Sequence, residues 1–309
     1  MSDALVTSCR ERWSEWFPDE STPSVSMVLL TQGRQDDRAT LLVFANRSRT
    51  PRLAVKVGWS ESAIGALRTE GETLRDIGSY FPKLTVTVPR FLGMLDSNNG
   101  EALVMLAVDG RRCVLPRARY RSTPTVGRYL SRLVELHEST SVGAVSCETR
   151  SLSDLSWLAH WAAVSSRANR ARAATFHQLA DDIASCSMRY RPCWQHGDLA
   201  SGNVLCGKKG QPLGVIDWEL ANARQDPWFD LSYIACATAF ELGGTTAPMV
   251  GWVVKEVVKP RWSYGFPLQH GMALTALRAA HRAECHVRGS KERWLDVAAG
   301  MLPGTQGAR

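Results

Sequence analysis

The chain has 309 residues, of which 44% are hydrophobic and 22% charged, an ordinary composition for a globular protein with room for two lobes. The net charge of +7 would suit nucleic-acid binding, but the arginines are scattered, so we expect a mildly basic surface and no nucleic-acid partner. The eight cysteines form no C-x-x-C motif and the first residues form no apolar signal core, which predicts a cytoplasmic protein without zinc or disulfides.

The amino-terminal hundred residues are typical of a helix followed by an antiparallel sheet. Residues 1–20 predict a short helix, and its apolar side consists of Trp13, Trp16 and Phe17. From residue 24 onward, β-rich runs alternate with turns. The turn 32–38 contains Gly33, so its backbone either covers a phosphate group or forms a plain hairpin; both interpretations stay open.

The strand expected at 53–57 contains a lysine that needs an explanation. Lys56 lies in an otherwise apolar run, where burying its charge is costly unless an anion meets it. Ser60 can cap a helix that continues to about Ile77, and on this helix Glu70 falls among the apolar positions. Lys56 is either an edge-strand charge that discourages aggregation or half of an ion pair, and we favour the pair with Glu70.

The next segments predict a change from sheet to helices. The apolar strand 102–108 ends at a turn and makes a natural hinge, so we place one lobe at 1–106 and a second at 107–309. A helix is expected from Thr123 to His137, and another helical region at 152–188. The core candidates of that region are Trp157, Leu158, Trp161, Phe176 and Leu179. The longest apolar stretch, 231–254, is interrupted by Glu241, which favours a buried helix followed by a loop over a membrane span.

Three oxygen-bearing side chains lie close together in the stretch 194–231. Asp198 follows a short strand, and a predicted hairpin begins after Asn203 and ends at Asp217. Because the two ends of an antiparallel hairpin are neighbours, Asn203 and Asp217 can share one ion. Mg²⁺ prefers a few oxygen ligands and keeps its other positions for water and phosphates. The stretch therefore predicts a site where ATP and magnesium meet a hydroxyl group.

These residues and their spacing resemble the aminoglycoside phosphotransferase and choline kinase family. The segment His196-Gly-Asp-Leu-x-x-Gly-Asn-Val-Leu205, then Ile216-Asp-Trp-Glu219 and Asp226-Pro-x-x-Asp-Leu231, carries the resemblance, together with Lys56 and Glu70. It covers residues of about 25 to 240, and only the Gly-rich loop matches poorly. The resemblance implies an α+β, bilobal protein-kinase-like fold with a small antiparallel-sheet lobe and a larger, mainly helical lobe. It also implies a small-molecule kinase that uses ATP and Mg²⁺.

The same resemblance implies a role for each matching residue. Lys56 would hold the α- and β-phosphates and Glu70 would orient it, while Asp198 would act as the catalytic base. Asn203 and Asp217 would bind magnesium. The adenine would lie against Ala54 and the hinge residues Met105, Leu106 and Val108. His196 would be structural, bonding the backbone near Asp217, and Asp230 would cap the following helix and tie the catalytic loop together.

Three functions other than a small-molecule kinase are alternatives for this sequence. A protein kinase needs a long activation segment, but Asp217 and Asp230 are only thirteen positions apart, so a small-molecule acceptor is favoured. A P-loop NTPase is excluded because the chain has no G-x-x-x-x-G-K-[ST] motif. The remaining alternative is a catalytically silent pseudokinase that serves as a nucleotide-binding or scaffold module.

The acceptor is less well defined by the sequence. Residues 232–309 contain nine Lys or Arg against five Asp or Glu. Because aminoglycosides are polycations, their pocket should be rich in carboxylates. The basic excess therefore slightly favours a neutral or anionic hydroxyl compound over an aminoglycoside. The identity of the acceptor and the oligomeric state are left open.

Overall fold

The computed structural model describes residues 2–32, 37–80, 88–97, 100–112, 149–207, 212–245, 248–286 and 290–302. The chain folds as two units, one formed by residues 1–113 and 203–221 and the other by residues 114–202 and 222–309. The lobe boundary that we expect at residues 106 and 107 remains a prediction. The helix expected from Thr123 to His137 and the phosphate-loop candidate Gly33 lie outside the described residues.

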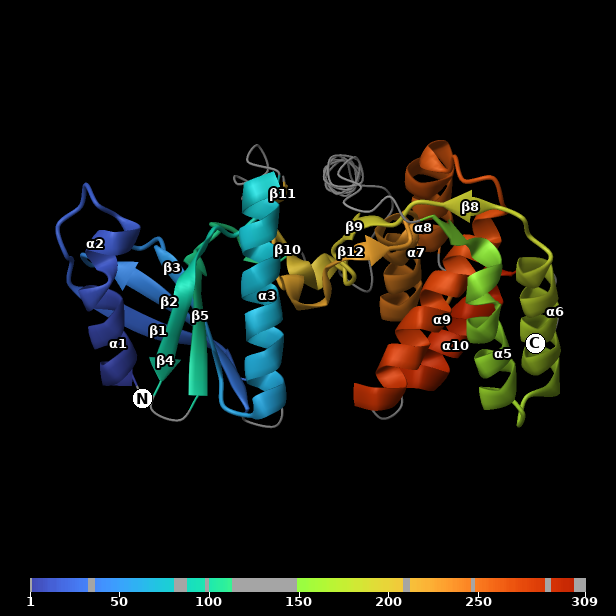
Figure 1. Cartoon of the computed structure of the whole chain (residues 1–309), viewed down its shortest axis with the longest axis horizontal. Helices are drawn as coiled ribbons and strands as arrows, with labels where there is room; N and C mark the ends of the chain where they lie inside the picture. The colour runs from blue at the N-terminus through green and yellow to red at the C-terminus, as the bar shows by residue number, and fades with distance from the viewer. Residues whose placement is uncertain are drawn as a thin grey trace. The chain divides into compact units, whose positions relative to one another are not determined.

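Five antiparallel strands form the sheet of the first unit, in the spatial order β1-β2-β3-β5-β4 (Figure 1). The strands are β1 (Val25–Gln32), β2 (Arg38–Ala45), β3 (Leu53–Gly58), β4 (Phe91–Ser97) and β5 (Gly100–Leu106). In β3 the side chains of Leu53, Val55 and Val57 are fully buried, whereas the two residues between them are partly exposed. This alternation follows from the two-residue period of a strand, and it separates an apolar face from a face that carries Lys56.

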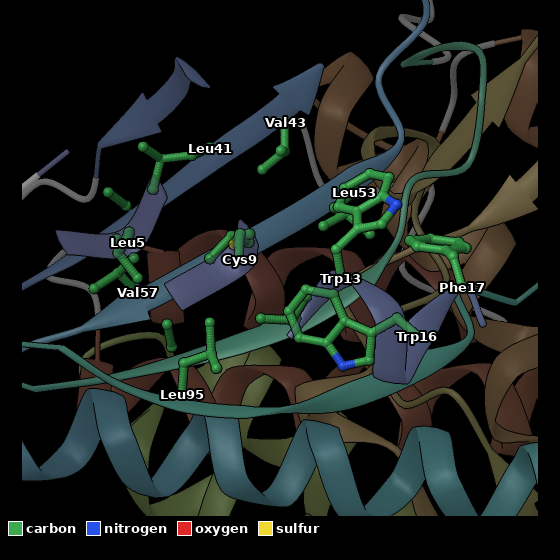
Figure 2. Close-up of a cluster of buried hydrophobic side chains, with 14 residues drawn as sticks. Leu5, Cys9, Trp13, Trp16, Phe17, Leu41, Val43, Leu53, Val57 and Leu95 are labelled. Carbon is green, nitrogen blue, oxygen red and sulfur yellow. The ribbon is translucent and has the colours of Figure 1, made fainter. Parts of the chain in front are cut away.

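Helices cover both faces of this sheet. On the apolar face lie α1 (Ser2–Glu11) and α2 (Trp13–Trp16), two helices where the sequence predicts a single short one within residues 1–20. Figure 2 shows their side chains, among them Leu5, Cys9 and Trp13, packed against the strands. Trp13 is completely buried, and removal of such a side chain typically costs about 3–5 kcal/mol. The opposite face is covered by α3 (Glu61–Tyr80), which begins where the Ser60 hydroxyl accepts a hydrogen bond from the Ala63 N–H.

A second, smaller sheet completes the first unit. The predicted hairpin is present as β10 (Val204–Cys206) and β11 (Pro212–Val215), and β10 also pairs with β6 (Arg111–Arg112). The helical turns η3 (Ser201–Asn203) and η4 (Trp218–Leu220) flank the hairpin in sequence. Two positions that are far apart in the chain, Arg112 and Leu205, become direct partners in this sheet.

The second unit is mainly helical. Two short ladders pair β7 (Arg150–Ser151) with β8 (Arg189–Tyr190) and β9 (Cys193–Gln195) with β12 (Asn222–Gln225). Its helical elements are η2 (Leu152–Leu155), α5 (Ser156–Ser165), α6 (Arg170–Ala184), α7 (Phe229–Leu242), α8 (Pro248–Val253), η5 (Val254–Val258), η6 (Lys259–Arg261), α9 (Leu268–His286) and α10 (Ser290–Met301).

Helix α7 is the central helix of this unit, with every residue from Phe229 to Ala239 buried. Leu158, Phe176 and Leu179 are buried as predicted. The prediction of Trp157 as a core residue is wrong, because this side chain is 50% exposed, although its ring lies edge-on to His281 of α9. Within the part of the chain that the structure describes, every helix is too short or too polar to cross a lipid bilayer.

Candidate functional site

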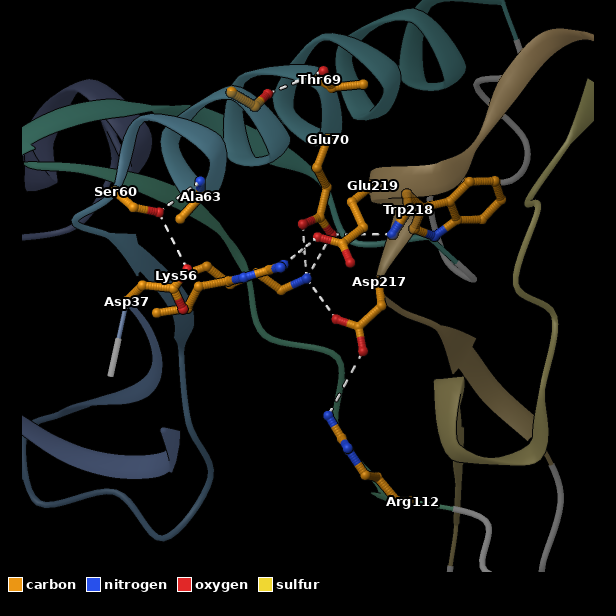
Figure 3. A network of polar contacts seen from close by, with 12 residues as sticks. Asp37, Lys56, Ser60, Ala63, Thr69, Glu70, Arg112, Asp217, Trp218 and Glu219 are labelled. Atoms are coloured by element: carbon orange, nitrogen blue, oxygen red, sulfur yellow. Dashed lines mark hydrogen bonds and ion pairs between the residues drawn. The ribbon is translucent and has the colours of Figure 1, made fainter. Parts of the chain in front are cut away.

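Lys56 and Glu70 form the centre of the polar network in the first unit (Figure 3). Lys56 Nζ lies 2.8 Å from Oε1 and 2.7 Å from Oε2 of Glu70, so the ion pair favoured from the sequence is present. It forms because β3 directs Lys56 toward α3, where Glu70 is buried on the packed side. Burial opposes the charge of Lys56, but the carboxylates of Glu70 and Asp217 outweigh it and raise the pKa of the ammonium group.

Asp217 lies at the end of the β10–β11 hairpin and joins the same network. Its Oδ1 is 2.5 Å from Lys56 Nζ, and its Oδ2 is 3.7 Å from Arg112 Nη2. Asp217 has a φ of 63°, a left-handed conformation that is uncommon for residues other than glycine and tends to persist at functional sites. The next residue, Trp218, donates its backbone N–H to Glu70 Oε1 at 3.1 Å, which fastens the end of the hairpin to α3.

The hairpin brings Asn203 to the same end as Asp217, as we expect from its antiparallel pairing. The Ile216 N–H donates to the Asn203 carbonyl at 2.8 Å, and Val204 is the register partner of Val215. Asn203 is buried, with 8% of its surface exposed. One amide and one carboxylate therefore lie at adjoining ends of two paired strands, a donor set that suits a hard divalent cation.

The proposed adenine-binding residues lie on two paired strands of the first unit and just after the second of them. Ala54 in β3 is the register partner of Met105 in β5, so their side chains share one face of the sheet. Leu106 donates its backbone N–H to a carbonyl of the residue before β4, and Val108 follows the end of β5. Contact of these four residues with a base remains a prediction.

In the second unit, Asp198 lies in a loop that two neighbours hold in place. The carboxylate of Asp230 accepts hydrogen bonds from the backbone N–H groups of His196 and Gly197, the latter at 2.9 Å. Arg282 of α9 donates to the Gly197 carbonyl at 2.9 Å. Gly197 has a φ of 82°, which a residue with a side chain would adopt only with strain. Asp230 ties the loop together in this way, but it does not cap α7, whose cap position is Trp228.

The carboxylate of Asp198 is itself held by a tyrosine that the sequence analysis missed. Tyr233 donates its hydroxyl to Asp198 Oδ1 at 2.6 Å. The ring of Tyr233 is buried and stacks on Phe229 and Trp294, with ring planes 17° and 27° apart. Burial, together with the charge of Asp198, raises the pKa of Tyr233 well above its usual value, so the hydroxyl stays a donor.

His196 and Asp226 also have buried partners in this unit. The Nδ1 atom of His196 accepts the Asp198 N–H at 3.2 Å, whereas the expected bond to backbone near Asp217 remains a prediction. Asp226 precedes Pro227, which predicts a turn; in the structure it is 2% exposed and makes an ion pair with Arg278 at 2.7 Å. It also accepts the Tyr190 hydroxyl at 2.6 Å, so it anchors the segment before α7.

A cavity of the second unit lies away from this loop. It has a volume of about 850 Å³ and is lined by residues of α8, η5 and η6, the start of α9 and the end of α10, among them Val250, Leu268 and Met301. Asp230 and Leu242 lie near opposite ends of α7, twelve positions apart, which corresponds to roughly 18 Å along a helix. The size of this cavity is therefore no guide to the position of the Asp198 chemistry.

Residues 43–252, more than half of the chain, match the phosphotransferase enzyme family, abbreviated APH. None of the curated proteins matches the chain in sequence. Among solved structures, the GDP complex of aminoglycoside 2′-phosphotransferase-IIIa is similar, at 15% identity over 97% of this chain and 98% of that one, with a TM-score of 0.60.

Two further structures show the same likeness. The GDP and kanamycin complex of APH(2″)-IIia is 16% identical over 93% of this chain and 94% of that one, with a TM-score of 0.54. Amicoumacin kinase hAmiN in complex with AMP-PNP, Ca²⁺ and Ami is 10% identical over 90% of each chain, with a TM-score of 0.51. At these identities the likeness shows the fold, and it confirms the predicted protein-kinase-like architecture with an antiparallel-sheet lobe and a mainly helical lobe.

Proposed function

The chain belongs to the phosphotransferase enzyme family, and from this premise we propose that it transfers the γ-phosphate of ATP to a hydroxyl group of a small molecule. The observation that carries the proposal is the position of Lys56 between the carboxylates of Glu70 and Asp217. A lysine held in this way can neutralise phosphate oxygens, which is most of what phosphoryl transfer requires of a protein. The nucleotides GDP and AMP-PNP in the names of the similar structures support a nucleotide donor.

The residues of the first unit fit a magnesium ion together with a nucleotide. Asp217 and Asn203 offer one carboxylate and one amide oxygen, and no group of three or more His, Cys, Asp or Glu residues within the described ranges could hold a metal alone. This sparse donor set suits Mg²⁺, because the ion keeps several positions for phosphates and water. When bound, magnesium would neutralise the charge that develops on the transferred group.

Each residue then has a specific part in the reaction. Lys56 binds the α- and β-phosphates, and Glu70 keeps its ammonium group in place. Asp198 accepts a hydrogen bond from the acceptor hydroxyl and orients it for attack on the γ-phosphate. Asp230 and His196 hold the backbone of the Asp198 loop, so the carboxylate needs little reorganisation during the reaction.

The acceptor that we propose is a neutral or anionic hydroxyl compound. Helix α9 directs Arg282 to the Asp198 loop, and Tyr233 contacts the Asp198 carboxylate. A cation and a neutral hydroxyl group so close to the base do not favour a polycationic acceptor. Kanamycin belongs to the name of one similar structure, so aminoglycosides remain necessary members of any acceptor panel.

The deciding experiment measures phosphate transfer from Mg-ATP to aminoglycosides, choline-like alcohols, sugars and nucleosides. We expect transfer to at least one neutral or anionic acceptor, and loss of about 10²- to 10⁴-fold in turnover with Asp198→Asn. ATP binding should be retained in that variant, because Asp198 faces the acceptor. Nucleotide binding without transfer to any acceptor would favour the pseudokinase. Equal turnover of the wild type and Asp198→Asn would show that Asp198 is not the catalytic base.

A further inference from the structure

Arg112 reaches the network of the first unit from β6, a strand that had no part in the site expected from the sequence. Its pairing with β10 places it beside the hairpin that carries Asp217, and its guanidinium Nη2 lies 3.7 Å from Asp217 Oδ2 (Figure 3). The Arg112 side chain is 48% exposed, so it can change partners without breaking a packed core. Arg112 is therefore the second cation beside the Asp217 carboxylate, whose Oδ1 already lies 2.5 Å from Lys56 Nζ.

Arg112 also lines a cavity of about 200 Å³ in the first unit. The charged residues of this cavity are Arg38, Lys56, Arg112, Asp217 and Glu219. Two of the cations have an acid of their own: Lys56 is paired with Glu70, and Arg38 Nη1 lies 2.7 Å from Glu219 Oε2. Among the residues that the structure describes, Asp217 is the one acidic partner of Arg112.

This distribution of partners has a consequence for nucleotide binding. Once Asp217 holds a divalent cation, both Lys56 and Arg112 are repelled from its carboxylate. Lys56 then stays with Glu70, whereas Arg112 is left with an unpaired guanidinium group at the wall of the cavity. A planar guanidinium group binds phosphate oxygens in pairs, more strongly than a neutral donor does.

We infer that Arg112 is a phosphate-binding residue that rests on Asp217 in the free protein and moves to the terminal phosphates of the bound nucleotide. This inference rests on the proposed function, because it needs a nucleotide in the Lys56 cavity. It adds a binding residue that neither the motif spacing nor the Lys56–Glu70 pair supplies. Arg112 is a positioning residue for the phosphate tail, and the chemical step remains with Asp198.

Arg111 provides a matched control for the test. It is adjacent to Arg112 in β6 and also exposed, and consecutive residues of a strand point to opposite faces. Arg111→Ala and Arg112→Ala therefore remove the same charge from the same strand, but only the second removes the Asp217 contact. Arg112→Lys keeps the charge and loses the planar fork, so it should restore part of the affinity.

The measurement is the equilibrium affinity for AMP, ADP and ATP in Mg²⁺ by titration calorimetry, which does not depend on turnover. Arg112→Ala should weaken ATP and ADP binding about 10-fold, as expected for loss of one hydrogen bond to a charged group, and leave AMP binding unchanged. Arg111→Ala should bind all three nucleotides as the wild type does. The thermal unfolding midpoint of each variant verifies that it is folded.

Each outcome leads to a definite conclusion. Equal ATP affinity of the two alanine variants would overturn the inference, and so would an equal loss of AMP, ADP and ATP binding by Arg112→Ala, which would indicate a general structural effect. A wild type that binds no nucleotide would overturn the proposed function and this inference with it. If the wild type binds ATP and Arg112→Ala binds it equally well, only the inference about Arg112 is overturned.

Discussion

Removal of the Tyr233 hydroxyl should reduce turnover more than it reduces stability. In Tyr233→Phe the ring stays stacked between Phe229 and Trp294, and only the 2.6 Å hydrogen bond to Asp198 is lost. A hydrogen bond to a charged group contributes about 1.5–3 kcal/mol, and 1.36 kcal/mol corresponds to about a tenfold change in rate. We expect kcat to fall about 10-fold because Asp198 loses its fixed orientation. KM for ATP should not change.

Tyr190→Phe is a closely matched control. Tyr190 and Tyr233 are each 6% exposed, and each donates its hydroxyl to an aspartate Oδ1 at 2.6 Å. Tyr190 contacts Asp226, which is buried and has no place in the proposed chemistry. Asp198 is partly exposed, so in Tyr233→Phe a water molecule can replace the lost hydroxyl as its hydrogen-bond donor. Tyr190→Phe should therefore lose more unfolding free energy, about 1.5–3 kcal/mol, and keep its kcat.

The assay pairs urea unfolding with steady-state kinetics for both variants in one acceptor screen. The expected result is a crossed pattern, in which Tyr233→Phe loses rate and Tyr190→Phe loses stability. If both variants lost kcat in proportion to their stability, or if Tyr233→Phe kept full turnover, the reasoning about Asp198 orientation would be refuted.

Three further predictions follow from burial and close approach. Lys56→Met should lower the unfolding free energy by about 3–5 kcal/mol, because Glu70 is left as a buried carboxylate, and a Lys56→Met/Glu70→Leu double variant should recover stability in denaturant titrations. Burial raises the pKa of the Cys9 thiol to about 11 from 9.0, so above pH 9 the unfolded chain loses this proton before the folded protein does. Unfolding at pH 10 should then be easier than at pH 8 by about 1 kcal/mol from this group, and Cys9→Ala should lack that part of the pH dependence. Gly100→Ala should destabilise the sheet, since its Cβ would lie 2.0 Å from the Gly58 carbonyl oxygen; an unchanged thermal midpoint would contradict this.

Local patterns in the sequence were sufficient to predict much of the first unit. The Lys56–Glu70 pair could be predicted because strand alternation and helical spacing each left one charge on an apolar face. The adjoining ends of the hairpin at Asn203 and Asp217 followed from chain reversal alone. The tyrosine at 233 was within reach of the same reasoning, because it lies three positions after Asp230 and so shares its side of a helix.

Other features depend on tertiary neighbours that spacing cannot supply. Arg112 meets Asp217 through the pairing of β6 with β10, which joins segments that are far apart in sequence. The sequence predicts a turn at Asp226 because Pro227 follows it. Its hydrogen-bond partner Tyr190 and its ion-pair partner Arg278 come from two elements that are distant in the chain. Trp157 is apolar enough for a core, but how much of its side chain stays exposed depends on how α5 packs against α9.

The discontinuity of the first unit has a consequence for the synthesis of the protein. Residues up to 113 supply the five-stranded sheet and α3, but the hairpin that holds Asp217 belongs to the segment 203–221. On a ribosome that adds about 5–20 residues per second, Asp217 follows residue 113 by roughly 5–20 s. During this interval the nascent sheet can form the Lys56–Glu70 pair, while the backbone partner of Glu70 at Trp218 does not yet exist. The first unit should therefore be completed late in translation, and a fragment that ends at residue 113 should be a poor substitute for it.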